Sequence, residues 1–310
     1  MKMMAIGLGK QYGASVCHAE GFQRMGYNVQ TFGNAIIKHA NILCGVGIVE
    51  NAFDETRKIK VMSKEDIGRT VDFASGRNRY IGHLISIPCH DFKNIKVGLD
   101  CSNGSSSAIA KSVFDALRAK TYVINNEPNG TNINRGCGST HIEVLRQFVV
   151  DKGLDIGFAY DGDADRCIAV DHRGNIIDGD KIMYVCGKYL REKGQLNGNT
   201  VVTTVMSNLG LYKSLEREGI DYEQTAVGDK YVAENMMENN YSIGGEQSGH
   251  IIFSRYSATG DGILTSLMIM EACVDQKATL CDLAKEMKVY PQLLRNVRVS
   301  DKKTALENEK

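Results

Sequence analysis

Apolar residues from about residue 63 onward gather in short runs that alternate with longer amphipathic stretches. Short runs of apolar or β-branched residues bounded by Gly, Asn or Asp are typical of buried strands, whereas apolar positions three and four residues apart are typical of helices. The predicted strands are 93–100, 121–125, 156–160, 167–171, 200–206, 222–227 and 296–299. The predicted helices are 63–85, 105–119, 139–152, 180–190, 210–218, 229–238, 260–273 and 280–288, with a further charged helix beginning at 301.

The order of these elements predicts the fold class. Strands that alternate with helices of this length form parallel βαβ units, and a return hairpin at 167–171 makes a sheet mixed. The series of strands and helices occurs twice, over residues 62–177 and 178–300. The repeat is one of topology and not of amino-acid sequence. We therefore expect an α/β protein with two similar domains, each a mixed sheet flanked by helices, and a linker beginning at 301–310.

Residues 1–61 have a different character. Residues 42–49 read as a strand, but no series of strands and helices surrounds them, and the pattern leaves the fold of this segment unassigned.

Composition removes several classes of function. Lys+Arg and Asp+Glu both number 37, so no global basic field attracts nucleic acid. No apolar run reaches 18 residues, so we expect no membrane span. The nine cysteines include no Cys-x-x-Cys pair and are odd in number, which fits reduced thiols in the cytoplasm better than a disulfide framework.

The motif Asp161-Gly-Asp-Ala-Asp-Arg166 carries the clearest chemistry in the chain. On a tight loop after a buried strand, Asp161, Asp163 and Asp165 can turn their oxygens toward one point, where three like charges repel. An all-oxygen set suits Mg²⁺, and the planar fork of Arg166 suits a neighbouring phosphate. A solvated acidic turn and a Ca²⁺ loop are the alternatives, although the EF-hand pattern wants a glycine where Arg166 stands.

A second polar stretch, residues 244–250, reads Gly-Gly-Glu-Gln-Ser-Gly-His. Glu246 and Ser248 are two residues apart, so on an extended loop they face the same way and can bind neighbouring sugar hydroxyls. His250 titrates near neutrality and can carry a proton. The alternative is a glycine-rich turn with a solvent-facing histidine. Lys230 can meet a phosphate, although a surface lysine is the default interpretation.

These motifs, together with 128–134 (Pro-Asn-Gly-Thr-Asn-Ile-Asn), 138–141 (Gly-Ser-Thr-His), 203–210 and 225–229, carry a family resemblance. From about residue 63 to 310 the sequence resembles the phosphoglucosamine mutases of the α-D-phosphohexomutase superfamily. The resemblance implies Mg²⁺-dependent interconversion of glucosamine 6-phosphate and glucosamine 1-phosphate for cell-wall precursors, through a phosphoserine and a bisphosphorylated sugar.

By the family pattern, the three aspartates of 161–166 hold Mg²⁺ and Arg166 steadies the transferring phosphoryl group. Glu246 and Ser248 then bind sugar hydroxyls, and His250 lies beside them. The implied partner is a phosphorylated amino sugar, with no nucleic acid and no membrane.

The resemblance also implies what the family has elsewhere. Its first domain carries the phosphorylated serine in a Ser-His-Asn-Pro loop, and its last carries an Arg-Pro-Ser-Gly-Thr loop; neither motif occurs in this sequence. Residues 62–177 and 178–300 then correspond to the second and third domains. We expect little or no mutase activity from this chain alone, and self-association through the faces that the other domains would cover.

The first sixty or so residues resemble a different family, the lactate-racemase-like proteins that depend on a nickel-pincer cofactor, but they bring no matched nickel ligand. The change in sequence character near residues 59–62 indicates a junction. A gene fusion, a rearrangement or an assembly error would produce such a junction. Three hypotheses follow: part of a mutase, a non-catalytic remnant that binds Mg²⁺ and sugar phosphate, and a nickel-dependent racemase-like protein. A phosphorylated serine, binding without turnover, and bound nickel would distinguish them.

Overall fold

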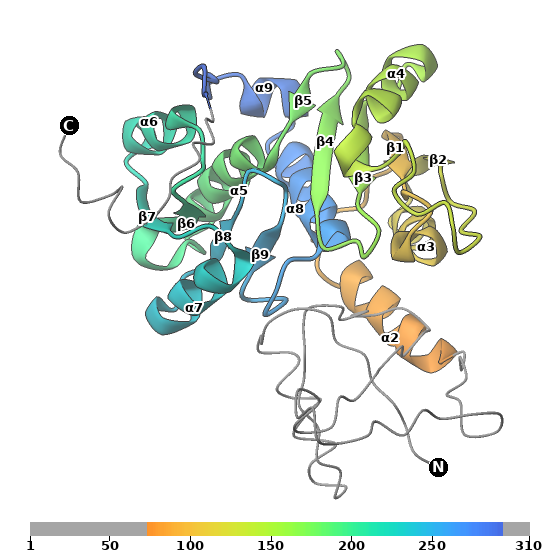
Figure 1. Cartoon of the computed structure of the whole chain (residues 1–310), viewed down its shortest axis with the longest axis horizontal. Coiled ribbons are helices and arrows are strands. Elements are labelled where there is room, and N and C mark those ends of the chain that lie inside the picture. The colour runs from red at the N-terminus through yellow and green to blue at the C-terminus, as the bar shows by residue number, and fades with distance from the viewer. Residues whose placement is uncertain (1–72, 294–310) are drawn as a thin grey trace, which may run out of the picture.

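A computed structural model describes residues 73–293 of the chain (Figure 1). Several predictions fall outside the described residues: the N-terminal segment 1–61 with its strand and junction, the start of the helix at 63–85, and the strand and charged helix after residue 295. Within the described range, no helix is long and apolar enough to cross a membrane.

The first half of the described chain forms a mixed five-stranded sheet in the order β2-β1-β3-β4-β5. Its strands are β1 (Lys96–Asp100), β2 (Lys120–Ile124), β3 (Ile156–Tyr160), β4 (Cys167–Asp171) and β5 (Ile176–Ile177). β1 pairs in parallel with β2 and β3, whereas β4 runs antiparallel to β3, and β5 antiparallel to β4. The predicted return hairpin is therefore present, and it makes the sheet mixed.

The second half repeats this arrangement in a four-stranded sheet, ordered β7-β6-β8-β9. Its strands are β6 (Thr200–Thr204), β7 (Asp221–Thr225), β8 (Ile243–Gly245) and β9 (Ile251–Phe253). β6 is parallel to β7 and β8, and β9 runs antiparallel to β8. In both sheets, a hairpin thus follows the third strand of a parallel set.

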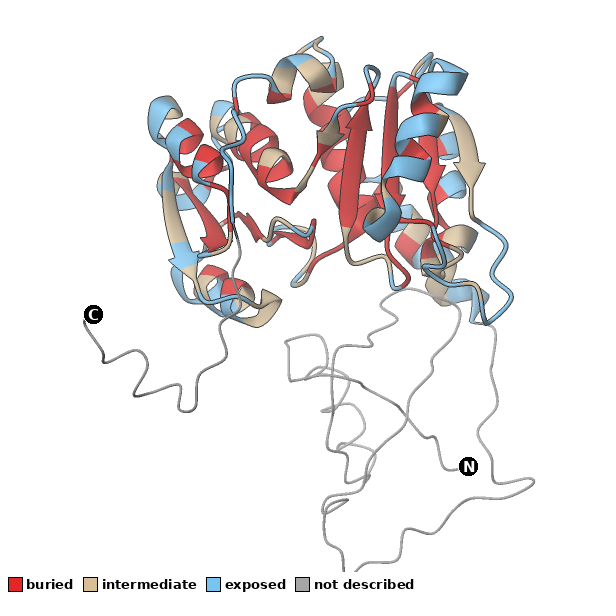
Figure 2. Ribbon diagram, turned by 45° about the horizontal axis from the view of Figure 1, so that its top comes forward, coloured by how far each residue is buried: buried red, intermediate tan, exposed pale blue. Residues whose placement is uncertain are grey.

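Helices cover both faces of each sheet, as predicted, and those between the sheets form a shared inner layer (Figures 1 and 2). The described α-helices are α2 (Ala74–Ile85), α3 (Ala110–Ala116), α4 (Glu143–Lys152), α5 (Gly179–Glu192), α6 (Leu209–Glu218), α7 (Asp229–Asn239), α8 (Gly262–Asp275) and α9 (Leu280–Ala284). α4 packs on the outer face of the first sheet and α7 on the outer face of the second, while α5 and α8 contact strands of both sheets.

Alternation along the strands explains these layers, because successive side chains point to opposite faces of a sheet. In β3, Ala159 packs with α4 in a small outer cluster, whereas Phe158 and Tyr160 join the large inner one. The inner cluster continues from the first sheet through α8 to the second sheet. α8 is buried along residues 262–272, which fits a helix that is apolar on all sides.

Polar caps mark where the inner helices begin. Asp178 accepts a hydrogen bond from the Lys181 N–H at the start of α5, and Asp261 accepts one from the Leu264 N–H at the start of α8. Three predicted helices are shorter than expected. In the helix predicted at 139–152, α4 begins only at Glu143, after a 3₁₀ turn at Ser139–His141. The helix at 105–119 is interrupted at Ile109 (φ −126°, ψ −51°) into a 3₁₀ turn and α3, and the helix at 280–288 ends with α9 at Ala284.

The predicted fold class is confirmed: the described residues form a mixed α/β structure with two sheets flanked by helices. Since β3 and β8 are each followed by a hairpin loop, the two loops 161–166 and 246–250 occupy the same position in the two sheets. These are the two stretches that the sequence singles out.

Candidate active site

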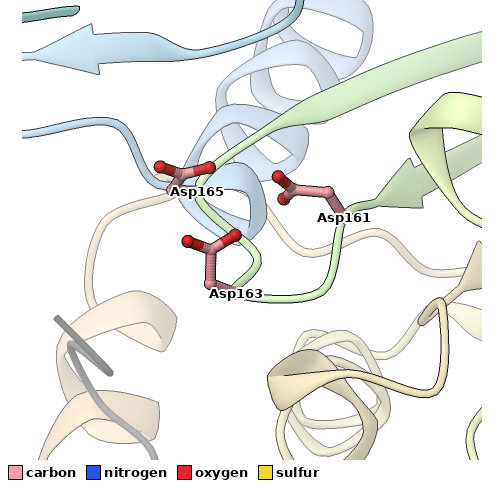
Figure 3. A group of neighbouring side chains, drawn as sticks. All are labelled: Asp161, Asp163 and Asp165. Atoms are coloured by element: carbon pink, nitrogen blue, oxygen red, sulfur yellow. The ribbon is translucent and has the colours of Figure 1, made fainter. Parts of the chain in front are cut away.

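The three predicted metal ligands lie on the loop between β3 and β4. The loop turns back at once, because the Asp161 carbonyl accepts from the Ala164 N–H (3.1 Å) and Asp161 Oδ1 accepts from the Arg166 N–H (3.1 Å). One carboxylate oxygen from each of Asp161, Asp163 and Asp165 lies within 4.8 Å of the others (Figure 3). The alternation of acids with small residues therefore brings three carboxylates together.

The electrostatics of this loop favour a cation. Burial, followed by the charges of Asp165 and Asp163, raises the pKa of Asp161 to about 8. Burial and the charge of Asp165 also raise the pKa of Asp163. These directions mean that the fully ionised set is disfavoured first by burial and then by its own repulsion. Because all the ligand atoms are oxygens, the set fits Mg²⁺, which would hold the three carboxylates in their charged form.

Arg166 completes the loop. Its Nε lies 3.8 Å from Asp161 Oδ2 and 4.0 Å from Asp165 Oδ1, so its charge partly offsets theirs. Its side chain is 43% exposed, and the guanidinium can therefore still receive a phosphate from solvent. A phosphate there would lie beside the acidic set.

The loop 246–250 joins β8 to β9 and meets the first loop directly. Arg166 and His250 form an isolated antiparallel bridge, and the Cys167 N–H donates to the Gly249 carbonyl (3.0 Å). A second bond, from the Gly179 N–H to the Gln247 carbonyl (3.0 Å), holds the other side of this loop. The loops after β3 and β8, which carry the predicted residues, are thus joined to each other by backbone contacts.

Glu246 and Ser248 face the same way on this loop, as their spacing suggests. Ser248 Oγ donates to Glu246 Oε2 (3.3 Å), and Glu246 Oε1 accepts from the Gly228 N–H (2.9 Å). Ser248 is exposed and Glu246 half-buried, so both can reach a bound molecule. Their acceptor and hydroxyl groups are of the kind that bind sugar hydroxyls.

His250 is buried, with 3% of its surface exposed, so a solvent-facing histidine is not what the structure contains. Its Nε2 lies 3.5 Å from Asp165 Oδ2 and 3.8 Å from Asp229 Oδ2. Gly260 packs against the face of the ring, where a Cβ would come within 2.4 Å of Nε2. His250 therefore connects the acidic loop to the start of α7.

Comparison with known proteins places both halves of the described chain in one family. Residues 78–174 match phosphoglucomutase/phosphomannomutase alpha/beta/alpha domain II, and residues 178–290 match domain III of the same family. This chain belongs to the phosphoglucomutase/phosphomannomutase family.

Relatives within the family are phosphoglucosamine mutases. That of Lachnoclostridium phytofermentans is 62% identical over 259 residues, which are 83% of this chain and 58% of that protein. That of Lachnospira eligens is 58% identical over 254 residues, 82% of this chain and 56% of that protein. The chain therefore spans a little more than half the length of these relatives, and the resemblance to phosphohexomutases read from the sequence is confirmed.

Solved structures of the family share the fold. A phosphoglucomutase/phosphomannomutase family protein of Burkholderia thailandensis superposes with a TM-score of 0.61 at 20% identity, over 70% of this chain and 47% of that one. An N-acetylphosphoglucosamine mutase of Aspergillus fumigatus, solved in complex with GlcNAc-6P and magnesium, superposes with a TM-score of 0.57 at 17% identity, over 72% of this chain and 54% of that one.

Lys230, the remaining predicted residue, lies in the first turn of α7. Its Nζ pairs with Glu234 Oε1 (3.5 Å) on the same helix and lies 5.9 Å from the centre of the Tyr231 ring. The described contacts of its side chain are thus with α7 itself, although its neighbour Asp229 faces His250. A role for Lys230 toward phosphate stays a prediction.

Asp229 is the residue that sequence reasoning missed. It begins α7, at the end of a stretch (225–230) that the sequence shows as polar, but no local spacing connects it with His250 or Asp165. The contact arises because α7 begins at the same edge of the second sheet as the loop after β8. Family members that retain an acid here would carry the only signal visible without a structure.

One described cavity, of about 440 Å³, lies at the opposite ends of the strands of the second sheet, away from these loops. It is lined by the end of α5, the turn after it and the residues that flank β8 and β9, including Gln195, Ser242 and Arg255. None of the predicted site residues lines it, so the candidate active site is the junction of the two loops.

Proposed function

We propose that this chain carries the magnesium-binding and sugar-binding part of a phosphoglucosamine mutase, which interconverts glucosamine 6-phosphate and glucosamine 1-phosphate. The observation that carries the proposal is the junction between the acidic loop and the Glu246–Ser248 loop through Arg166 and His250. The identity with curated phosphoglucosamine mutases supports the reaction class, and the magnesium and GlcNAc-6P complex of the fungal neighbour supports the ligand classes.

In this proposal Asp161, Asp163 and Asp165 hold Mg²⁺, which when bound supplies positive charge beside the transferring phosphoryl group. Arg166 binds phosphate oxygens from its partly exposed position at the rim. Phosphoryl transfer depends mainly on positioning and charge neutralisation, which these side chains provide.

The second loop positions the sugar. Glu246 and Ser248 contact sugar hydroxyls, and their orientation is kept by the Gly228 N–H that binds Glu246. His250 is the candidate proton carrier, since its Nε2 lies within 4 Å of a carboxylate oxygen on each of Asp165 and Asp229. Lys230 is a candidate for phosphate contact if its pairing with Glu234 opens.

We further propose that residues 62–300 do not complete the reaction unaided. The phosphorylated serine of the family lies in a Ser-His-Asn-Pro loop, and the sequence printed here contains no such motif. A non-catalytic protein that binds Mg²⁺ and sugar phosphate is the second candidate function, supported by the same loops. Robust glucosamine 1-phosphate formation by the purified chain, free of host mutase, would contradict our expectation.

Two further predictions belong to this proposal. The cysteines that the structure describes are free thiols, which supports a reducing compartment such as the cytoplasm. Self-association through the faces that further domains of the family would cover stays a prediction, and Val205, Val227 and Tyr231 are among the exposed large apolar side chains that the structure describes. A monomer by sedimentation that binds no hydrophobic dye would count against self-association.

The test of the function is direct binding of glucosamine 6-phosphate to the full chain by isothermal titration calorimetry in the presence of Mg²⁺. Glu246→Gln keeps the size of the side chain but removes its charge, and we expect it to weaken binding by about tenfold, or about 1.4 kcal/mol. Mg²⁺ binding should not change, because Glu246 belongs to the second loop.

The matched control is Glu238→Gln on the exposed surface of α7, which removes the same charge away from the loop and should leave sugar-phosphate binding as in the wild type. Glucosamine without phosphate tests whether the phosphate contributes. A wild-type chain that binds Mg²⁺ but no glucosamine 6-phosphate would exclude the proposed sugar site.

A further inference from the structure

A buried carboxylate that touches none of the predicted ligands organises the walls of the acidic loop. Asp100 ends β1, the strand beside β3, and is fully buried. Its Oδ1 accepts from the Ser102 N–H (3.0 Å) and from Asn125 Nδ2 (3.0 Å), and its Oδ2 accepts from the Gly138 N–H (2.9 Å). We propose that Asp100 is the positioning residue of the magnesium site, an inference that rests on the magnesium site proposed above.

The first wall is the turn 102–105, which Asp100 holds through the Ser102 N–H. Ser102 and Asn103 both have φ near +49°, a conformation that L-residues adopt at a cost and that the surrounding bonds must maintain. This turn contacts the acidic loop through the backbone of Gly162. The Ser105 N–H donates to the Gly162 carbonyl (2.9 Å), and Gly104 lies so close that a Cβ would be 2.4 Å from the same oxygen.

The second wall is the segment 133–138, which Asp100 holds through the Gly138 N–H. Gly138 (φ +75°) packs against the Tyr160 carbonyl, where a Cβ would lie 2.5 Å away. Ile133 and Asn134 close over Gly162, since a Cβ there would come within 2.6 Å of the Ile133 side chain and 2.8 Å of Asn134 Nδ2. The Asn134 N–H also donates to the Ser102 carbonyl (2.9 Å), which joins the two walls.

Both walls therefore meet at Gly162, the residue between Asp161 and Asp163. A metal site depends on ligands held to within a fraction of an ångström, and groups that orient the ligands typically change metal affinity by 10- to 100-fold. Here the orienting group acts on backbone and not on a ligand side chain. Asp100→Asn keeps the size of Asp100 but directs an amide N–H at one of its three donors, so at least one hydrogen bond to a wall is lost.

The same sheet provides a matched control. Asp171 ends β4, which runs antiparallel to β3, so it lies beside the start of β3, at the opposite end of the strands from the acidic loop. It is also buried (1% exposed), and it accepts from the Arg173 N–H (2.9 Å), the Asn175 N–H (2.9 Å) and Asn175 Nδ2 (2.8 Å). Asp171→Asn therefore disturbs a comparable set of bonds without touching the walls of the acidic loop.

The experiment compares the wild-type chain, Asp100→Asn and Asp171→Asn. Mg²⁺ affinity is measured by calorimetry, Mn²⁺ coordination by electron paramagnetic resonance, and folding by thermal unfolding without metal. We expect Asp100→Asn to weaken Mg²⁺ binding by about tenfold and to broaden the bound Mn²⁺ signal. Asp171→Asn should stay within about twofold of the wild type, even if it lowers the melting temperature equally.

Wild-type affinity in folded Asp100→Asn would overturn the inference, as would an equal loss in Asp171→Asn. A wild-type chain that binds no divalent cation would instead contradict the proposed magnesium site itself. If Asp100→Asn does not fold, Asn125→Gly removes one donor to Asp100 while easing the φ of +51° at that position. It should weaken Mg²⁺ binding two- to fourfold, and an unchanged affinity would overturn the inference.

Discussion

The loops after β3 and β8 occupy the same place in two similar sheets, yet they carry different chemistry. Loop 161–166 holds three carboxylates in a partly buried group, whereas loop 246–250 holds one carboxylate, one hydroxyl and one buried imidazole. Each loop connects a strand at the end of a parallel set to an antiparallel partner. The repeated topology therefore provides two equivalent positions, and in our proposal the residues of one bind a cation and those of the other bind a sugar.

The difference also shows how the halves depend on each other. Burial, and then the charges of Asp165 and Asp163, raise the pKa of Asp161, so ionisation of the acidic loop is costly, whereas the second loop is held mainly by backbone hydrogen bonds. The bridge between Arg166 and His250 joins them. A change in the first loop should therefore act on cation binding, and a change in the second on sugar binding and on the junction.

The largest expected effect comes from removing one metal ligand. Asp161→Asn should weaken Mg²⁺ binding by at least 100-fold, about 2.7 kcal/mol, because a charged oxygen ligand is lost. Thermal unfolding without metal, measured above pH 8 where the Asp161 carboxyl is ionised, should occur at the same or a higher temperature, since a buried like charge is removed. The matched change in the other loop, Ser248→Ala, should leave Mg²⁺ affinity within twofold. Equal losses in both variants would break the comparison.

An effect of similar size, on folding stability and not on cation binding, is expected at the junction of the two loops. Gly249 has φ +92°, and a Cβ there would lie 2.4 Å from the carbonyl oxygen of Cys167, the first residue of β4. Gly249→Ala should lower the free energy of unfolding by about 2–4 kcal/mol, from backbone strain and the steric clash together. Gly153→Ala, at φ +58° with open space around it, isolates the strain and should cost about 1 kcal/mol. Denaturant titration measures both, and equal costs would show that the junction is not tightly packed.

The smallest effect, counted per pH unit, is expected in the pH dependence of cation binding. Below pH 8 the Asp161 carboxyl carries a proton that Mg²⁺ must displace, because burial and its neighbours raise its pKa to about 8. Mg²⁺ affinity should therefore rise with pH by up to about tenfold per unit between pH 6 and 8, and then level off. Calorimetry in buffers of matched ionic strength measures it. Affinity that stays flat from pH 6 to 8 would mean that the acidic loop is not strained as described.

Local sequence predicted those parts of the site whose residues are neighbours in the chain. The spacing of Asp161, Asp163 and Asp165 places three carboxylates on one tight loop, and the spacing of Glu246 and Ser248 places both on one side of another. Strand and helix periodicity also predicted the two series of elements. It did not predict the interruption at Ile109, because neither Ile109 nor the residues around it include a Pro or Gly that would mark the end of a helix.

Tertiary structure decided which distant residues meet. Asp165, Asp229 and His250 come together because the two sheets share an inner layer, and no spacing in the chain encodes that contact. Close approach also depends on Gly260 and Gly262, where a Cβ would strike the His250 ring or the Arg166 carbonyl.

The sequence by itself thus determined the chemistry of each loop, because ligand spacing on a short loop is a local property of the backbone. Only the packed structure decided that the loop of three acids and the loop of Glu246 and Ser248 lie side by side. Backbone contacts between residues far apart in the chain join the two loops, from Cys167 to Gly249 and between Arg166 and His250. These contacts require both sheets to pack against α8.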